Sequence, residues 1–379
     1  MISYGKHFID KEDIKQAIKS LKSDFITQGP NVLLFEKKLK EKFSAHAAAL
    51  SSGTAALHLS GKALNWSSGD IVLTVPITFV ATANTVLYSG AKLGLVDIDP
   101  KTLNIDLNIL EKKLKFLKKK GKKIKSLIAV DYAGNPCDWE SIKYLSKKYN
   151  FSVINDNCHA IGSKYKNSFN YAAKYADIVT HSYHAVKNIT TGEGGSVLSK
   201  NLKIIKLIKN LRTHGLKYFK NSKKISFYDM ENLGFNYRLT DFQSAIGISQ
   251  LKKINIFVKK RKEIAKFYDE AFRNVNNIII PPVSKYSSHS YHLYPIQIDF
   301  EKINSSKKAF FEYMKKKKIL LQSHYLPIYR HSFYRKKFNL KEFPASENFY
   351  KRQVSIPIFY TLKKKEMLKV TSLIKEFVK

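Results

Sequence analysis

Cysteine and long apolar runs are scarce in this chain of 379 residues, and each absence excludes a class of protein. Cys137 and Cys158 are the only cysteines, so no disulfide framework is expected and the pair fits a reducing compartment. Neither the cysteines nor the histidines have the spacing of a metal site, so we expect no metal. No apolar run is long enough to span a bilayer, and the N-terminus lacks the apolar core of a signal peptide. We therefore expect a soluble, cytoplasmic protein with no membrane partner.

Acidic residues are also few, since 30 Asp and Glu stand against 67 Lys and Arg and leave a formal net charge of +37. Clustered lysine favours a nucleic-acid hypothesis, because it neutralises phosphates. The lysine runs fall in separate segments, at 118–123, 315–318 and 363–365, with no helix-turn-helix, zinc-finger or RNA-binding signature beside them. We interpret most of the charge as solvated surface, part of which attracts an anionic substrate. We expect no nucleic-acid partner; a steeply salt-dependent affinity for DNA or RNA would favour that alternative.

The apolar pattern predicts an α/β fold. Short β-like runs alternate with helical stretches, which indicates a mostly parallel central sheet with helices on both faces. These runs are 71–75, 93–96, 127–130 and 152–154. No repeat of fixed period is present, and no linker rich in Pro, Gly and Ser divides the chain.

Two domains of unequal size are expected from the length of the chain. We place a large cofactor-binding domain at 15–250. A smaller α+β domain follows at 251–379, with a strand at 291–298 and a terminal helix at 363–378. Residues 1–14 would pack on this smaller domain.

Lys187 lies between a polar run that begins at Ser182 and a glycine-rich turn at 192–195. A nucleophilic lysine has to be unprotonated, held in a water-poor pocket and placed against a carbonyl carbon, so that a Schiff base can form. Pyridoxal phosphate (PLP) is the commonest cofactor with that demand. A surface lysine before a tight turn is the alternative, because most lysines are exposed.

Three segments offer the partners that such a lysine needs. Asp156 ends a strand-like run, where a carboxylate can keep a pyridine nitrogen protonated, although it can also cap a helix. The run 51–54 opens an alanine-rich helix whose N–H groups and hydroxyls suit a phosphate, or merely cap the helix. Phe79 follows the break at Pro76 and is either a stacking partner for a flat heterocycle or a core residue.

Together these segments resemble the DegT/DnrJ/EryC1/StrS family of PLP-dependent sugar aminotransferases. The likeness runs from 27–30 to 324–329 and so covers nearly the whole chain. Its most specific parts are the lysine segment at 182–195 and the Asn-Tyr-Arg segment at 236–238. The resemblance implies the fold of the fold-type I PLP-dependent transferases.

The resemblance also implies a role for each matching residue. Lys187 would form the Schiff base with PLP and move the proton between the amino carbon and the cofactor. The other implied cofactor contacts are with the pyridine nitrogen (Asp156), the ring face (Phe79), the phosphate (Gly53, Thr54 and Ser182) and the neighbourhood of the ring hydroxyl (His159, where the family more often has glutamine).

Asn236 matches a residue that reaches the phosphate from the neighbouring subunit, which implies a homodimer with a shared active site. Tyr294, His324 and Tyr325 are candidates for contacting the nucleotide sugar, and buried packing explains them equally well. Arg212 and Arg238 either bind the carboxylate of the amino donor or form structural ion pairs.

The implied reaction is a ping-pong exchange, in which L-glutamate gives up its amino group and a UDP-linked 4-keto sugar then takes it at C4. His159 and the Tyr-Ala-Gly segment at 132–134 favour the branch of the family that serves pseudaminic acid and cell-surface polysaccharide. Branches that act on 4-amino-4-deoxyarabinose or perosamine precursors stay open. A branch that dehydrates sugars has histidine at the Schiff-base position, so Lys187 disfavours it.

Overall fold

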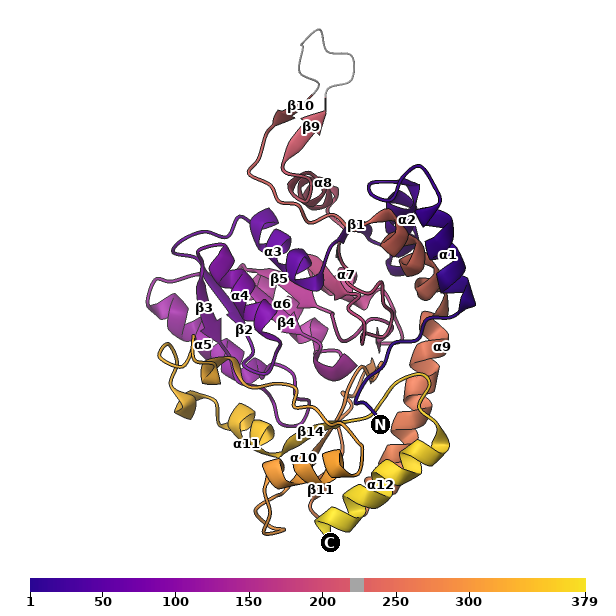
Figure 1. The fold of residues 1–379 in the computed structure, drawn as a ribbon. Helices are drawn as coiled ribbons and strands as arrows, with labels where there is room; N and C mark the ends of the chain where they lie inside the picture. Colours follow the sequence, from indigo (N-terminus) through magenta and orange to yellow (C-terminus); the bar gives the residue numbers. More distant parts are fainter. Residues whose placement is uncertain (219–227) are drawn as a thin grey trace.

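The computed structural model describes residues 1–218 and 228–379. A seven-stranded sheet lies at its centre, in the order β1-β8-β7-β5-β4-β2-β3, and Figure 1 shows helices packed around it. Strands β7, β5, β4, β2 and β3 pair in parallel, whereas β8 is antiparallel to both β7 and β1. The strands are β1 (His46–Leu50), β2 (Ile71–Thr74), β3 (Lys92–Leu95), β4 (Ile124–Val130), β5 (Ser152–Asp156), β7 (Ile178–Ser182) and β8 (Gly195–Ser199). The predicted mostly parallel sheet is confirmed.

Helices cover both faces of this sheet. Side chains alternate between the two faces along each strand, and apolar side chains on both faces are buried against helices. On β5, Ile154 joins a core with residues of α3 (Gly53–Ala63), α4 (Val80–Tyr88) and α8 (Leu202–Leu211). Its neighbour Val153 joins the core on the other face. That core includes residues of α2 (Pro30–Phe43), α5 (Leu107–Lys119), α6 (Trp139–Tyr149) and α7 (Tyr171–Tyr175).

A second hydrophobic core lies around a three-stranded antiparallel sheet in the order β11-β13-β14, in which β11 is Ile278–Ile279. It contains residues of β13 (Tyr294–Ile298), β14 (Gln353–Ile356), α10 (Lys307–Lys316) and α12 (Lys364–Val378). Near the N-terminus, Ile2 also belongs to this core. The backbone of Ile2 donates to Lys318 O (2.8 Å) and accepts from Leu320 N (2.8 Å).

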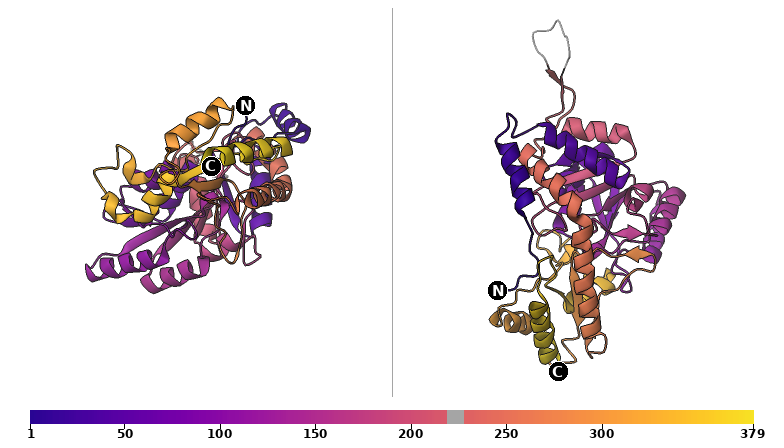
Figure 2. Two further views of the ribbon diagram at one scale, coloured as in Figure 1. Left: turned by 90° about the horizontal axis from the view of Figure 1, so that it is seen from below. Right: turned by 90° about the vertical axis from the view of Figure 1, so that its right-hand side faces the viewer.

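Helix α9 (Asp241–Phe272) contributes to both cores. Leu251, Ile254 and Phe257 pack in the core of the large sheet, whereas Tyr268 and Phe272 pack in the second core. Figure 2 shows α9 running along the molecule and ending beside α12. The predicted boundary at residue 250 falls inside this helix, and the division into domains stays a prediction.

The other elements are short or peripheral. They are α1 (Lys11–Leu21), β6 (Lys164–Tyr165), β9 (Leu216–Tyr218), β10 (Tyr228–Met230), β11 (Ile278–Ile279), β12 (Ser287–Ser288), α11 (Pro344–Arg352) and three 3₁₀ turns, η1 (Tyr132–Gly134), η2 (Ile328–Arg330) and η3 (Leu340–Glu342). Strands β9 and β10 extend away from the body (Figure 1). Within the described ranges, none of the helices has the length and apolar character needed to cross a bilayer.

Asp131, directly after β4, holds the end of β5 in place through hydrogen bonds. Its fully buried carboxylate accepts hydrogen bonds from Asn155 and Asn157, the two neighbours of Asp156. Cys137 N, the indole of Trp139 and the hydroxyl of Tyr171 donate to the same carboxylate. Burial raises the pKa of Asp131 to about 6, although hydrogen bonds from Cys137, Tyr171 and Asn155 act in the opposite direction.

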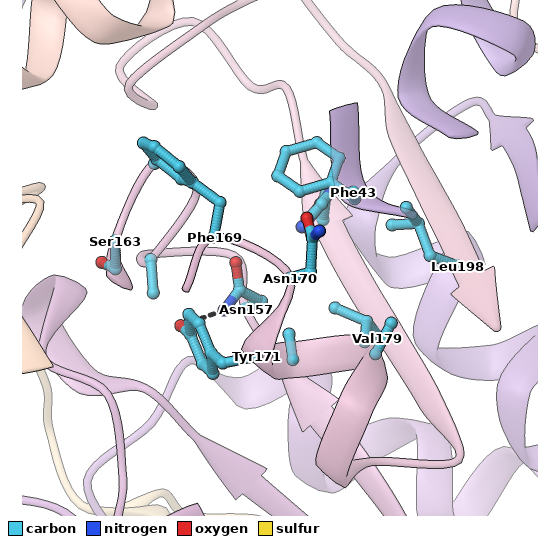
Figure 3. Close-up of a pocket in the computed structure, with 13 residues that line it drawn as sticks. Phe43, Asn157, Ser163, Phe169, Asn170, Tyr171, Val179 and Leu198 are labelled. Atoms are coloured by element: carbon cyan, nitrogen blue, oxygen red, sulfur yellow. Dashed lines mark hydrogen bonds between the residues drawn. The ribbon is translucent and has the colours of Figure 1, made fainter. Parts of the chain in front are cut away.

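Figure 3 shows two of these donors, Asn157 and Tyr171, meeting beside a small cavity between Phe43 and Phe169. The volume of this cavity is about 10 Å³, room for one water at most. The cavity therefore belongs to the packing of the structure.

We expect Asp131→Ala to lower the free energy of unfolding by roughly 3–5 kcal/mol, because five buried donors lose their acceptor. Urea unfolding followed by circular dichroism measures this change. Asp138→Ala is the matched control, since Asp138 is an exposed cap of α6 and such caps contribute about 1 kcal/mol. Equal losses in the two variants would contradict the anchoring role.

Candidate active site

A cavity of about 540 Å³ lies at the carboxyl ends of the parallel strands, which is where open α/β sheets bind ligands. Val130, Asp156 and Ser182, the last residues of β4, β5 and β7, all line it. Nine residues that the sequence selected as site candidates line this one cavity: Gly53, Thr54, Phe79, Asp156, His159, Ser182, Lys187, His324 and Tyr325.

Lys187 lies in the loop between β7 and β8, and a backbone hydrogen bond from its N–H to His184 O (2.9 Å) helps to shape that loop. Its Nζ lies 3.4 Å from Nε2 of His292. Burial lowers the pKa of Lys187, although Cys158 and Asp156 act in the opposite direction. Because the unprotonated amine is the nucleophilic form, this environment suits Schiff-base chemistry.

Asp156 is a buried carboxylate that forms no ion pair with any residue in the described ranges. Its Oδ2 accepts from the hydroxyl of Thr82 (2.8 Å), and its Oδ1 accepts from Cys158 N (3.3 Å). A buried carboxylate without a cation is costly unless a ligand brings positive charge to it. A protonated ring nitrogen would supply that charge, so the residue fits the role implied by the resemblance.

The start of α3 has the properties of an anion site. Ser52 caps the helix through Ala55 N (3.1 Å), while the N–H groups of Gly53 and Thr54 occupy the first helical turn, where no intrahelical acceptor exists. Space there is tight, since a Cβ on Gly53 would lie 2.9 Å from the Cβ of Ser182. Thr54 and Ser182, which carry hydroxyls, line the same cavity as Gly53, and these groups together fit a phosphate.

Phe79 is 55% exposed although it is a large aromatic residue. It precedes α4 and contributes to the wall of the cavity, with its ring 6.0 Å from that of Tyr325. An open aromatic face in this place is available to stack on a flat ring.

His159 and Tyr325 form a hydrogen-bonded pair in the wall of the cavity. Burial holds the pKa of His159 well below its usual value, so the imidazole is neutral. Nδ1 accepts from Ala133 N (3.3 Å), which leaves the proton on Nε2 to donate to the Tyr325 hydroxyl oxygen (2.8 Å). The hydroxyl proton of Tyr325 is then free to donate to a ligand.

His324 lines the cavity beside Tyr325, and a hydrogen bond to β14 fixes its ring. Its Nδ1 lies 2.9 Å from the hydroxyl of Ser355 on β14. Burial lowers the pKa of His324 to about 3, so this side chain is also neutral.

Two predicted site residues lie elsewhere in the structure. Tyr294 is fully buried in the second core, where its hydroxyl donates to Asp269 (2.5 Å), so its contact with a sugar is not supported. Asn236 is exposed and does not line the cavity of its own chain.

The two candidate arginines differ in their surroundings. Arg212 pairs with the buried carboxylate of Glu36 and donates to Ala49 O. These contacts agree with a structural ion pair, the second of the two roles offered by the sequence. Arg238 has no such ion pair among the described residues, although both arginines line a separate cavity of about 140 Å³.

The sequence gives no role to several residues that line the cavity, among them Thr82 and His292. Thr82 in α4 bonds to Thr78 (2.9 Å), which lies four residues earlier and just before the helix, and this spacing is the signal that relates them. His292 comes from a loop distant in sequence, and only the fold brings it to Lys187. Within the described ranges, no group of three His, Cys, Asp or Glu could hold a metal ion.

Comparison with known proteins decides the family. The sequence pattern of the DegT/DnrJ/EryC1/StrS aminotransferase family matches residues 7–375. The chain belongs to this family. It is therefore a sugar aminotransferase, and the resemblance seen in the sequence is confirmed.

Named relatives are similar over almost their whole length. The UDP-4-amino-4,6-dideoxy-N-acetyl-beta-L-altrosamine transaminase of Campylobacter jejuni is 42% identical, covering 94% of this chain and 92% of the relative. The protein MJ1066 of Methanocaldococcus jannaschii is 39% identical, covering 98% and 96%. Helicobacter pylori PseC, an aminotransferase involved in the biosynthesis of pseudoaminic acid, superposes with a TM-score of 0.90 at 34% identity, covering 100% and 99% of the two chains.

We expect Gly53→Ala to weaken the binding of inorganic phosphate at least about tenfold, because the new Cβ displaces Ser182 and distorts the start of α3. Isothermal titration measures this affinity. Gly5→Ala is the control, since its Cβ would meet Val186 at an ordinary 3.5 Å. Unchanged phosphate affinity in Gly53→Ala would locate the anion elsewhere.

Proposed function

We propose that this aminotransferase uses PLP to move an amino group from L-glutamate to C4 of a UDP-linked 4-keto-6-deoxy-N-acetylhexosamine, in pseudaminic acid biosynthesis. The observation that carries the proposal is Lys187, an amine with a lowered pKa in the same cavity as the buried, cation-free Asp156. Relatives from Campylobacter jejuni and Helicobacter pylori that bear the altrosamine transaminase name, at 42% and 37% identity, support the sugar. A solved Streptococcus pneumoniae relative called a PLP-form supports the cofactor, at 25% identity.

Bound PLP supplies an electron sink that stabilises negative charge at the amino carbon. Asp156 would hold the ring nitrogen protonated, which keeps that sink effective. Lys187, once released from its covalent role, would accept and return the proton at the amino carbon. Phe79 would hold the ring flat, while Gly53, Thr54 and Ser182 fix the phosphate, so that the geometry persists through both halves of the reaction.

The second half of the site would come from another subunit. Asn236 lies on a segment whose backbone meets the start of the anion site, through Ser51 N to Tyr237 O (2.9 Å), yet its side chain is exposed. Exposed apolar residues also gather on α1, α2 and the loop between them: Ile14, Ile18, Leu21, Phe25, Ile26, Leu33 and Leu34. An apolar surface of this kind favours association with a second copy, and the proposed assembly is a homodimer.

The substrate is tested by incubating the enzyme and PLP with nitrogen-labelled L-glutamate and the UDP-linked 4-keto sugar. We expect mass spectrometry to find the label in the sugar. Labelled amino sugar formed only from a different 4-keto nucleotide sugar would contradict the pseudaminic acid assignment and leave the aminotransferase intact. Transfer from another amino acid, but not from L-glutamate, would contradict the donor.

We expect Lys187→Ala to lower transamination at least about a thousandfold while leaving the fold intact, because only the reactive amine is lost. Lys187→Arg should be equally inactive, since a guanidinium keeps its proton. The exposed Lys174→Ala serves as control. Substantial turnover by either Lys187 variant would remove the lysine from the mechanism.

We expect Asn236→Ala to weaken PLP retention about tenfold, because the neighbouring subunit then lacks one donor to the phosphate. Equilibrium dialysis of the holoenzyme measures retention, with the exposed Asn108→Ala as control. Retention equal to that of Asn108→Ala would argue against a shared site.

A further inference from the structure

His292 is the side chain within hydrogen-bond distance of the reactive amine in the described structure. Its Nε2 lies 3.4 Å from Lys187 Nζ, and the described parts of the chain give Nζ no other hydrogen bond or ion pair. Arg261 fixes the backbone that carries His292, since its Nη1 donates to the carbonyls of Tyr291 (3.0 Å), His292 (3.2 Å) and Ile358 (2.9 Å). The imidazole is therefore held at a defined place beside the lysine.

The imidazole of His292 is neutral. The side chain is buried, and desolvation is the first cause that holds the pKa of His292 well below its usual value. The charged or titratable groups that face it are Lys187, His159, Arg261 and His324, and each disfavours a further positive charge. The rings of His159 and His292 lie 4.6 Å apart, which places one neutral imidazole against another.

The buried ring leaves one acceptable place for the single proton of this neutral imidazole. Nδ1 of His292 is buried and has no hydrogen-bond partner in the described chain. A proton on Nδ1 would be an orphaned buried donor, which folded proteins rarely contain, whereas an unpaired lone pair is less costly. The proton therefore belongs on Nε2, the nitrogen that faces Lys187.

An Nε2–H group can donate only to a lone pair, and the lysine nitrogen has one only when it is unprotonated. An ammonium would have to donate to Nε2 and would force the imidazole proton onto Nδ1. The pair is thus compatible with the free amine and incompatible with the ammonium. Asp156 and Cys158, which favour the ammonium, face the same lysine from β5 and the loop that follows.

We propose that His292 is a positioning residue. It donates its Nε2–H to the amine of Lys187 and keeps that amine unprotonated while the lysine is not bonded to the cofactor. Rotation of the amine away from His292 then exposes its lone pair to the proton on the amino carbon. The inference rests on the proposed function, because it assigns Lys187 a reactive amine.

The first test measures the protonation of Lys187 in the protein without cofactor, by competitive acetylation across neutral and alkaline pH with peptide mass spectrometry. We expect His292→Leu to raise the midpoint of Lys187 acetylation by about 0.5–1 pH unit, because the amine loses its donor. His292→Gln keeps an N–H donor and should restore the midpoint. His331→Leu, at a partly exposed histidine that does not line this cavity, is the control and should not shift it.

A midpoint that stays or falls in His292→Leu would overturn the proposal, since a fall is what an accepting imidazole predicts. Nitrogen NMR of the histidine-labelled wild-type protein answers the same question should the leucine variant not fold. A proton on Nε2 of His292 is expected, and a proton on Nδ1 would overturn the proposal. Both measurements omit the cofactor, so failure to bind PLP would count against the proposed function alone.

The rate of turnover is a second measurement, and a purely structural role for His292 would not change it. We expect kcat to fall about tenfold in His292→Leu, with KM for L-glutamate unchanged and kcat restored in His292→Gln. An unchanged kcat in a folded His292→Leu enzyme would also overturn the proposal.

Discussion

The partial withdrawal of one lysine amine from water is the constraint on which the rest of the structure depends. Lys187 loses solvation because the ends of β4, β5 and β7, the start of α3 and the segments around His292 and Tyr325 close around one cavity. Desolvation disfavours the ammonium and so lowers the pKa of Lys187, against the opposing influence of Cys158 and Asp156. The amine is made reactive by where the fold places it, and the carboxylate stays available for a different partner.

The charges of the polar groups in the cavity affect whether the amine of Lys187 is protonated. Asp156 is buried and forms no ion pair with any residue in the described ranges, whereas His159, His292 and His324 are all held neutral because burial lowers their pKa. A protonated histidine beside Lys187 would add repulsion, and a second carboxylate would stabilise the ammonium. Neutral imidazoles provide directed hydrogen bonds without either effect. The anchoring of Asn155 and Asn157 by Asp131 then fixes the strand end that presents Asp156.

Much of the fold and most of the cavity could be predicted from local sequence. Strands β2, β4 and β5 are largely buried apolar runs that the sequence pattern detects, and Lys187, Asp156 and Gly53 lie in segments with distinctive neighbours. In the segment 291–295, local sequence does not predict which side chain faces the cavity. The sequence makes Tyr294 a candidate for contacting the sugar, with buried packing as an equal alternative, yet it is His292 that reaches the lysine. Tyr291 adopts a positive φ of 50° and the strand begins only at Tyr294. Alternation along a strand does not extend through such a bend, so the face of each side chain follows from tertiary packing alone.

The most direct test of a desolvated, reactive Lys187 is the absorption spectrum of the purified protein titrated with PLP at neutral pH, before and after excess L-glutamate. A visible band that forms at one PLP per chain, is absent in Lys187→Ala and disappears with L-glutamate is the predicted result. Failure of the wild-type protein to form the band would contradict the central claim, because an amine that stays protonated in this cavity cannot capture the cofactor.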